Sequence, residues 1–99
     1  MAHYLKTEDL SAQQMSVFLT ITKNEADVVK CLLELDFTGK MFAQFGLRDY
    51  DNLLAENNQR VFYPSTVRKL LHLRDRFRYG IVFGEKSQFK ALLDYNNKI

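Results

Sequence analysis

Residues 26–37, ADVVKCLLELDF, constrain the fold of this chain more than any other stretch. On a helical wheel, Asp27, Lys30 and Glu34 fall on one narrow stripe, and apolar side chains cover nearly all of the remaining surface. A helix with so little polar surface is stable only when other elements surround it. The pattern therefore predicts a central, mostly buried helix around which the rest of the chain packs.

Signals for the start and the end flank this helix. Thr22 and Glu25 have the spacing of a capping box, and either Thr22 or Asn24 is expected to supply the cap. Gly39 predicts the end of the helix, because glycine readily adopts the left-handed conformation that follows a last turn. Residues 41–45 are apolar and fit either a short helix or a loop.

Two further helices precede and follow this region. Ser11, with a glutamine three residues later, forms a capping-box pattern and predicts a helix over residues 12–20. Gly46 is expected to break the chain before residues 47–56, where leucine and tyrosine recur at helical spacing.

The next predicted helix is basic on one side. Pro64 lies at its expected entrance, Ser65 or Thr66 can cap it, and it runs to about Phe77. Its apolar face is predicted to consist of Val67, Leu70, Leu71, Leu73 and Phe77, and its opposite face of Arg68, Lys69, His72, Asp75 and Arg76. Arg74 falls within the apolar arc, so its charge must reach water or find a partner.

A strand and a last helix complete the predicted order. Residues 78–83 are β-branched and aromatic around a glycine, and Gly84 with its two neighbours suits a tight turn, so we expect a strand or hairpin arm. A helix over residues 86–95 would follow and bury Phe89, Leu92 and Leu93.

The length and composition indicate one soluble domain over residues 1–99. Ninety-nine residues suffice for a single core, and 46% of them are hydrophobic. No apolar run approaches the roughly 18 residues that cross a bilayer, so we expect no membrane segment and a cytoplasmic location. The single cysteine, Cys31, cannot form an internal disulfide and fits a buried thiol.

Charge is distributed unevenly along the chain. Counting Lys and Arg against Asp and Glu, residues 1–59 carry a net charge of −4, residues 60–78 carry +5 and residues 79–99 carry +1. A polyanion responds to such a local field more than to the net charge of +2. The distribution favours nucleic acid as a partner and argues against an acidic DNA mimic.

Enzymatic patterns are absent from the sequence. It contains no phosphate-binding glycine loop, no glycine-flanked serine and no set of zinc ligands, so we predict neither catalysis nor a cofactor or metal. His72 has no nucleophile or carboxylate at a recognisable spacing and is interpreted as a surface residue. Six aromatic residues could stack on bases but mostly fit a core: Phe42, Phe45, Phe62, Tyr63, Tyr79 and Phe83.

The segments ITKNEADVVKCLLEL, DYDNLLAE and PSTVRKLLHLRDRF, in this order, resemble the winged helix-turn-helix superfamily of DNA-binding regulators. The resemblance covers residues 22–84, with flanking helices at 10–21 and 86–97. It implies a mainly α fold with a small β-hairpin, or wing, and the function of a transcriptional regulator. Because a module this small makes few base contacts, we also expect a homodimer. The long connection between residues 56 and 65 leaves room for an extra strand at 61–63.

The resemblance also assigns a DNA site. Residues 47–56 match the supporting helix, 65–77 the recognition helix that enters the major groove, and 78–86 the wing. The groove-facing set would be Ser65, Thr66, Arg68, Lys69 and His72, and the phosphate-contacting set would be Arg60, Arg76, Arg78 and Lys86. The dimer interface would use either the amino-terminal helix (Leu10, Val17, Phe18, Leu19) or the carboxy-terminal one.

Two alternatives stay open. VFLTIT, RVFY and YGIVFG are each compatible with a strand, which would give a small α+β sheet domain covered by the basic helix. In function, the chain could instead be a compact interaction module or inhibitor that binds another protein. Such short proteins are common in phages and other mobile elements.

Overall fold

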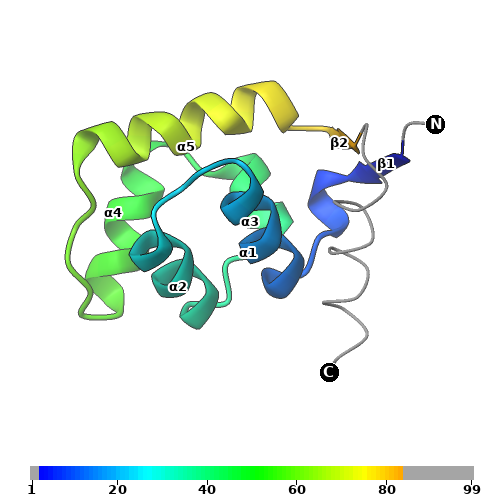
Figure 1. Cartoon of the computed structure of the whole chain (residues 1–99). Coiled ribbons are helices and arrows are strands. Elements are labelled where there is room, and N and C mark those ends of the chain that lie inside the picture. The colour runs from blue at the N-terminus through cyan, green and yellow to red at the C-terminus, as the bar shows by residue number, and fades with distance from the viewer. Residues whose placement is uncertain (1–2, 84–99) are drawn as a thin grey trace.

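The computed structural model describes residues 3–83 and shows a mainly helical domain with one small antiparallel sheet. The chain order, shown in Figure 1, is β1 (His3–Lys6), a 3-10 helix η1 (Thr7–Asp9), α1 (Ala12–Ile21), α2 (Ala26–Glu34), α3 (Gly39–Gln44), α4 (Leu47–Glu56), α5 (Pro64–Phe77) and β2 (Gly80–Phe83). The predicted helix 86–95, the flank 86–97 and the turn at 84–86 lie outside the described residues.

Helix α5 is the longest described element and lies across the other helices, from α4 at one end to the two strands at the other (Figure 1). Beneath it, aromatic rings from several elements form the centre of the core, with edge-to-face contacts between most neighbours. Their centroids are 5.1 to 6.4 Å apart, and the set consists of Phe18, Phe37, Phe42, Phe45, Tyr50 and Phe77.

The start of α1 follows the sequence pattern. The Ser11 hydroxyl accepts a hydrogen bond from the Gln14 backbone N–H at 3.2 Å, and the Gln14 side chain accepts one from the Ser11 N–H at 2.9 Å. The predicted capping box is therefore confirmed. The helix extends one residue beyond the predicted end, to Ile21.

The second capping-box prediction, at Thr22 and Glu25, is wrong. Glu25 is the N-cap of α2 and makes no side-chain cap hydrogen bond. Thr22 and Asn24 instead complete the end of α1: the Thr22 hydroxyl donates to the Phe18 carbonyl oxygen at 2.9 Å, and Asn24 Nδ2 donates to the Leu19 carbonyl oxygen at 2.8 Å. With only three residues between Thr22 and Ala26, the polar side chains satisfy the last carbonyls of α1 rather than the first N–H groups of α2.

Helices α1, α2 and α4 all end with a residue in the left-handed conformation, and none of these residues is glycine. Lys23, Asp36 and Asn58 have φ angles of 69°, 56° and 57°. In each case the next residue donates its N–H to the carbonyl oxygen five residues before it, as Phe37 does to Leu32 at 3.0 Å. The prediction of a stop at Gly39 is therefore wrong, because α2 ends at Glu34 and Asp36 closes it.

Gly39 begins α3 instead, and it is required for close packing. A Cβ atom at this position would lie 1.8 Å from the Thr7 carbonyl oxygen and 2.9 Å from the Leu10 Cβ. The Gly39 N–H donates to the Leu10 carbonyl oxygen at 2.9 Å, and the Thr38 side chain accepts from the Met41 N–H. Residues 41–45, ambiguous in sequence, thus belong mainly to a short capped helix.

Helix α2 is less central than its sequence predicts. Val28, Val29 and Leu32 are buried, but Ala26 is exposed and Cys31 and Leu33 are only half-buried. The helix packs on α1 along one face, and its other apolar residues are covered only in part. A helical wheel shows which faces of a helix are apolar enough to be buried. The number of neighbouring helices decides how many of those faces are covered.

The sheet joins the two ends of the described chain. β1 and β2 pair antiparallel, with Tyr4 opposite Val82 and Leu5 opposite Ile81. The predicted strand at 78–83 is confirmed from Gly80, and its partner among the described residues is β1. Residues 61–63 form no strand, and residues 17–21 of VFLTIT lie within α1, so the alternative three-stranded α+β fold is wrong.

Among the helices that the structure describes, none combines the length and the apolar composition needed to cross a membrane.

Candidate nucleic-acid interface

The two faces of α5 are divided as its sequence predicts. Val67 and Leu70 are buried, and Leu71, Leu73 and Phe77 are half-buried against the core. Pro64 is the first helical residue, where its missing N–H and fixed φ are favourable. The N-cap is Tyr63 and makes no side-chain hydrogen bond, so neither Ser65 nor Thr66 caps the helix.

Five polar residues form one outward stripe on α5, which we call the basic stripe: Ser65, Arg68, Lys69, His72 and Arg76. All five are exposed. Their spacing of three and four residues keeps them on one side of the helix over three turns. Arg76 additionally lies over the Phe77 ring, with its guanidinium carbon 5.2 Å from the ring centroid.

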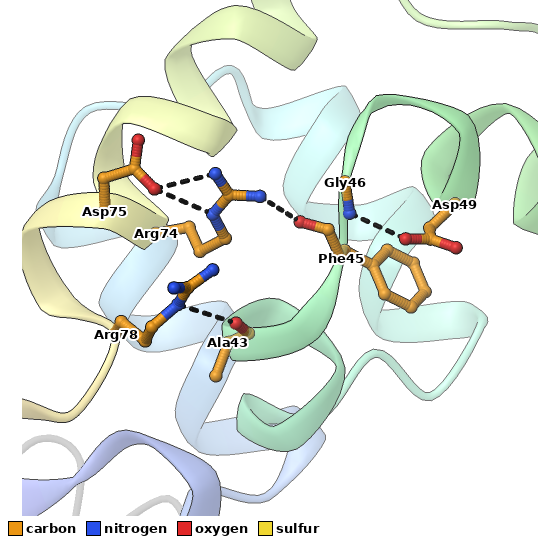
Figure 2. Close-up of polar contacts among 7 residues, drawn as sticks. All are labelled: Ala43, Phe45, Gly46, Asp49, Arg74, Asp75 and Arg78. Atoms are coloured by element: carbon orange, nitrogen blue, oxygen red, sulfur yellow. Dashed lines mark hydrogen bonds and ion pairs between the residues drawn. The ribbon is translucent and has the colours of Figure 1, made fainter.

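Arg74 does not belong to this stripe, and Figure 2 shows what it contacts instead. Its Nη1 donates to the Phe45 carbonyl oxygen at 2.6 Å, and its Nε and Nη2 donate to Asp75 Oδ1 at 3.0 and 2.7 Å. The sequence predicts that Arg74 needs a partner or water, and the structure provides two partners, the end of α3 and Asp75. Because Asp75 is engaged by Arg74, the acidic charge of α5 is neutralised beside the basic stripe.

Arg78 also contacts the end of α3. Its Nε donates to the Ala43 carbonyl oxygen at 3.3 Å (Figure 2). Two of the cations in residues 60–78 thus satisfy carbonyl groups at the last turn of α3, which has no basic residue of its own in that turn. Arg74 and Asp75 cancel each other, and the other five cations of residues 60–78 are exposed, so the local charge of +5 counted from sequence is carried at the surface.

The amino-terminal part of α5 lies beside the turn between α1 and α2. Lys69 Nζ donates to the Lys23 carbonyl oxygen at 2.5 Å. Ser65, Thr66 and Lys69 line one wall of a hollow of about 240 Å³, and Lys23 and Glu25 lie on the other. Thr66 is half-buried beside residues from the start of α2, so it does not belong to the basic stripe.

Arg60 lies in the connector between α4 and α5, on the rim of a second hollow of about 250 Å³. This hollow also contains Glu25 and Asp27 from the start of α2, together with apolar side chains from the connector. Arg60 is exposed but separated along the chain from the basic stripe, and two carboxylates share its surroundings. Lys86, the last predicted phosphate contact, lies outside the described residues.

The predicted dimer interface on the amino-terminal helix is wrong. Leu10, Phe18 and Leu19 are at most 3% exposed and belong to the core of the chain itself, and Val17 is half-buried against it. They cannot contact a second copy without unfolding α1. The alternative interface, which uses Phe89, Leu92 and Leu93, lies outside the described residues.

The aromatic residues divide into core and surface groups. Phe42 is fully buried, and Phe45 and Phe62 are half-buried. Tyr63 and Tyr79 are 72% and 81% exposed. Tyr4 is 58% exposed at the same end of the molecule as Tyr79 and was missed, because a lone tyrosine near a chain end carries no sequence signal of its surroundings.

Cys31 shows no sign of activation. Burial and the Glu34 carboxylate both raise the pKa of this thiol, which keeps it protonated at neutral pH. Among residues 3–83, no three His, Cys, Asp or Glu side chains lie together as metal ligands.

The chain matches no protein-family model, no curated protein and no solved structure in comparisons with each of them. Its function must therefore be inferred from its own residues and geometry.

Proposed function

We propose that this protein binds double-stranded DNA through the basic stripe of α5 and acts as a transcriptional regulator of the winged helix-turn-helix type. The observation that supports this most directly is the placement of Arg68, Lys69, His72 and Arg76 on the outer face of the longest described helix. The sequence charge identified the segment. Because these side chains are exposed along one continuous face of the helix, a rigid polyanion such as duplex DNA could contact all of them at once.

The dimensions of the stripe suit a major groove. The groove is about 12 Å wide and admits one α-helix of about 10–12 Å diameter. From Ser65 to Arg76 the helix rises about 16 Å at 1.5 Å per residue, which corresponds to about five base pairs along one strand. Ser65, Arg68, Lys69 and His72 would face base edges, and Arg76 would contact phosphate.

The supporting arrangement is also compatible with this function. Helix α4 packs on α5, and the connector of residues 57–63 joins them. This connector is longer than the turn of a minimal helix-turn-helix, but it anchors Phe62 against the core and so fixes the start of α5. One α5 contacts few base pairs, so we propose that the protein binds as a two-fold dimer to paired half-sites.

Charge reversal on the basic stripe tests the proposal. We expect Arg68→Glu with Lys69→Glu to lower the affinity for a random 20-base-pair duplex at about 50 mM salt at least 10-fold, measured by fluorescence anisotropy. The matched control is Lys30→Glu with Lys40→Glu, which makes the same charge change at exposed sites on α2 and α3. Equal losses in both variants would indicate a net-charge effect, and retained affinity in the first would contradict the α5 assignment.

A second function, binding to another protein, is supported by the hollow beside the connector. Val61 and Tyr63 are 56% and 72% exposed there, next to the carboxylates of Glu25 and Asp27. Exposed apolar side chains next to charges are common at protein interfaces. If the wild-type protein binds no duplex even at about 50 mM salt, this hollow becomes the candidate site.

A further inference from the structure

The outer face of the β1–β2 sheet carries a group of residues that the duplex-binding proposal does not use. Because directly opposed residues of an antiparallel pair share a face, Tyr4 and Val82 lie together, as do Lys6 and Gly80. Tyr4, Lys6 and Val82 are exposed. The other face carries Leu5 and Ile81, which contact the core. The inner face of the sheet is therefore apolar, and its outer face carries a tyrosine and a cation.

The Tyr4 ring is held in place although most of it is exposed. Gly80 lies under it: a Cβ atom on Gly80 would be 2.2 to 2.4 Å from the Cε2, Cζ and Oη atoms of Tyr4. The Tyr4 hydroxyl also donates a 3.4 Å hydrogen bond to the Tyr79 carbonyl oxygen. An aromatic ring fixed by its edge contacts loses little further entropy when a second ring stacks on it.

A second tyrosine and two cations lie beside this ring. Tyr79 is 81% exposed, and together with Tyr4, Lys6, Glu8 and Arg78 it lines a hollow of about 240 Å³. The hollow is smaller than the pockets of about 300–1,000 Å³ that hold drug-sized ligands, so it suits one planar group. The Arg78 Nε–H donates to the Ala43 carbonyl oxygen, which leaves the four other N–H donors of the guanidinium for a ligand.

We propose that this face, formed by Tyr4, Lys6, Arg78 and Tyr79, binds single-stranded nucleic acid by stacking unpaired bases on the two tyrosines. Among the described residues that line this hollow, the two cations outnumber the carboxylate of Glu8, which favours a polyanion over an acidic or neutral protein surface. Exposed aromatic rings interleaved with cations are the recurring arrangement of single-strand sites. A duplex cannot use the tyrosines in this way because its bases are already stacked, so this site is separate from groove binding by α5.

A tryptophan reporter tests stacking directly. The chain contains no tryptophan, so Tyr79→Trp introduces a single indole at the proposed site and keeps an aromatic ring there. We expect its fluorescence to be quenched in a saturable manner by a single-stranded 15-mer of thymidine. Leu47→Trp, at an exposed position at the start of α4 and away from both proposed sites, is the control and should not respond. Quenching of the control alone would overturn the assignment.

Affinity measurements provide the second test. Tyr79→Ala should weaken binding of the single-stranded 15-mer about 5- to 100-fold, which corresponds to the stacking of one base. Its affinity for a duplex should change by less than about 2-fold, and Leu47→Ala, at an exposed position on α4, should change neither affinity. Tyr4→Phe, which keeps the ring, should bind single strands like the wild type.

The two proposals can fail independently. Combined with Tyr79→Trp, Arg68→Glu with Lys69→Glu should abolish duplex binding but keep the quenching of the indole by the single strand, since those two residues lie on α5 and not on the sheet. Absence of single-strand binding by the wild-type protein would overturn this inference and leave the duplex proposal unaffected. If Tyr79→Ala instead converts a dimer to a monomer in sedimentation without changing single-strand affinity, the face is a contact between copies and the inference is wrong.

Discussion

Arg74 Nη1 and the carbonyl oxygen of Phe45 are joined by a 2.6 Å hydrogen bond that ties the middle of α5 to the end of α3 (Figure 2). The guanidinium side chain is 18% exposed, and Asp75 holds its other edge. Arg74 therefore acts as a structural residue within a helix whose remaining cations face solvent. This division of roles leads to the first prediction.

Replacing Arg74 should destabilise the fold. We expect Arg74→Ala to lower the free energy of unfolding by about 1–3 kcal/mol, because the Phe45 carbonyl loses a charge-assisted partner at a partly buried site. Arg68→Ala, on the exposed face of the same helix, should change it by less than about 0.5 kcal/mol. Urea denaturation of both variants checks this, and equal effects would contradict the structural role of Arg74.

Gly39 and Gly46 should differ sharply in their tolerance of a methyl group. We expect Gly39→Ala to cost several kcal/mol or to prevent folding, because its Cβ would overlap the Thr7 carbonyl oxygen. At Gly46 the nearest atom to such a Cβ is 3.7 Å away, and φ is −106°, so Gly46→Ala should cost less than about 1 kcal/mol. Thermal unfolding followed by circular dichroism distinguishes the two.

Glycine should be favourable at Asp36, where the backbone is left-handed. We expect Asp36→Gly to raise the free energy of unfolding by up to about 1 kcal/mol, because φ of 56° is strained for a residue with a Cβ. Lys30→Gly, at an exposed interior position of α2, should lower it by about 1 kcal/mol. Chemical denaturation of both variants should therefore show changes in the free energy of unfolding with opposite signs. A loss of stability in Asp36→Gly would contradict backbone strain at this residue.

The Tyr50 hydroxyl is buried and has no hydrogen-bond partner among the described residues, so its removal should not harm the fold. We expect Tyr50→Phe to be neutral or more stable by up to about 1 kcal/mol at pH 7, since an unpaired buried hydroxyl contributes only its desolvation cost. Equilibrium unfolding in urea checks this. A loss of more than about 1 kcal/mol would mean that the hydroxyl has a partner.

The same residue predicts an alkaline pH dependence. Burial raises the pKa of Tyr50 well above the usual value of about 10. Below pH 10 the phenol is neutral in both states, but at higher pH the unfolded chain ionises first, and the wild type loses up to about 1.4 kcal/mol of stability per pH unit from this group. The stability of Tyr50→Phe relative to the wild type should therefore increase between pH 10 and 11, and a constant difference would contradict the prediction.

Duplex binding should depend on salt in proportion to the phosphate contacts. Each contact contributes about −0.9 to the slope of log affinity against log salt concentration, so Arg76→Ala should make the slope shallower by about one unit. Lys30→Ala, on α2, should leave it unchanged. Fluorescence anisotropy between about 50 and 200 mM salt measures both, and an unchanged slope in Arg76→Ala would remove this residue from the interface.

Local chemistry determined much of the fold. The Ser11 and Gln14 pair, the break at Gly46 and Pro64 at the start of α5 each act within one or two turns, and each correctly placed a helix boundary. The division of α5 into apolar and basic faces follows from helical periodicity, so Arg68, Lys69, His72 and Arg76 were correctly predicted on its outer face, whereas Thr66, predicted to face the groove, is half-buried.

Other features depend on residues far apart in the chain, which local patterns do not contain. Gly39 is close to Thr7, Arg74 to Phe45, and β2 to β1, over separations of about thirty to eighty residues. For this reason the sequence misassigned Gly39 as a helix stop, left the partner of Arg74 open and did not indicate Tyr4 beside Tyr79. The sequence by itself determined where helices form and which faces are charged. Only tertiary packing decided which cations remain available to a ligand, because buried carbonyl groups must be satisfied before a side chain can serve binding.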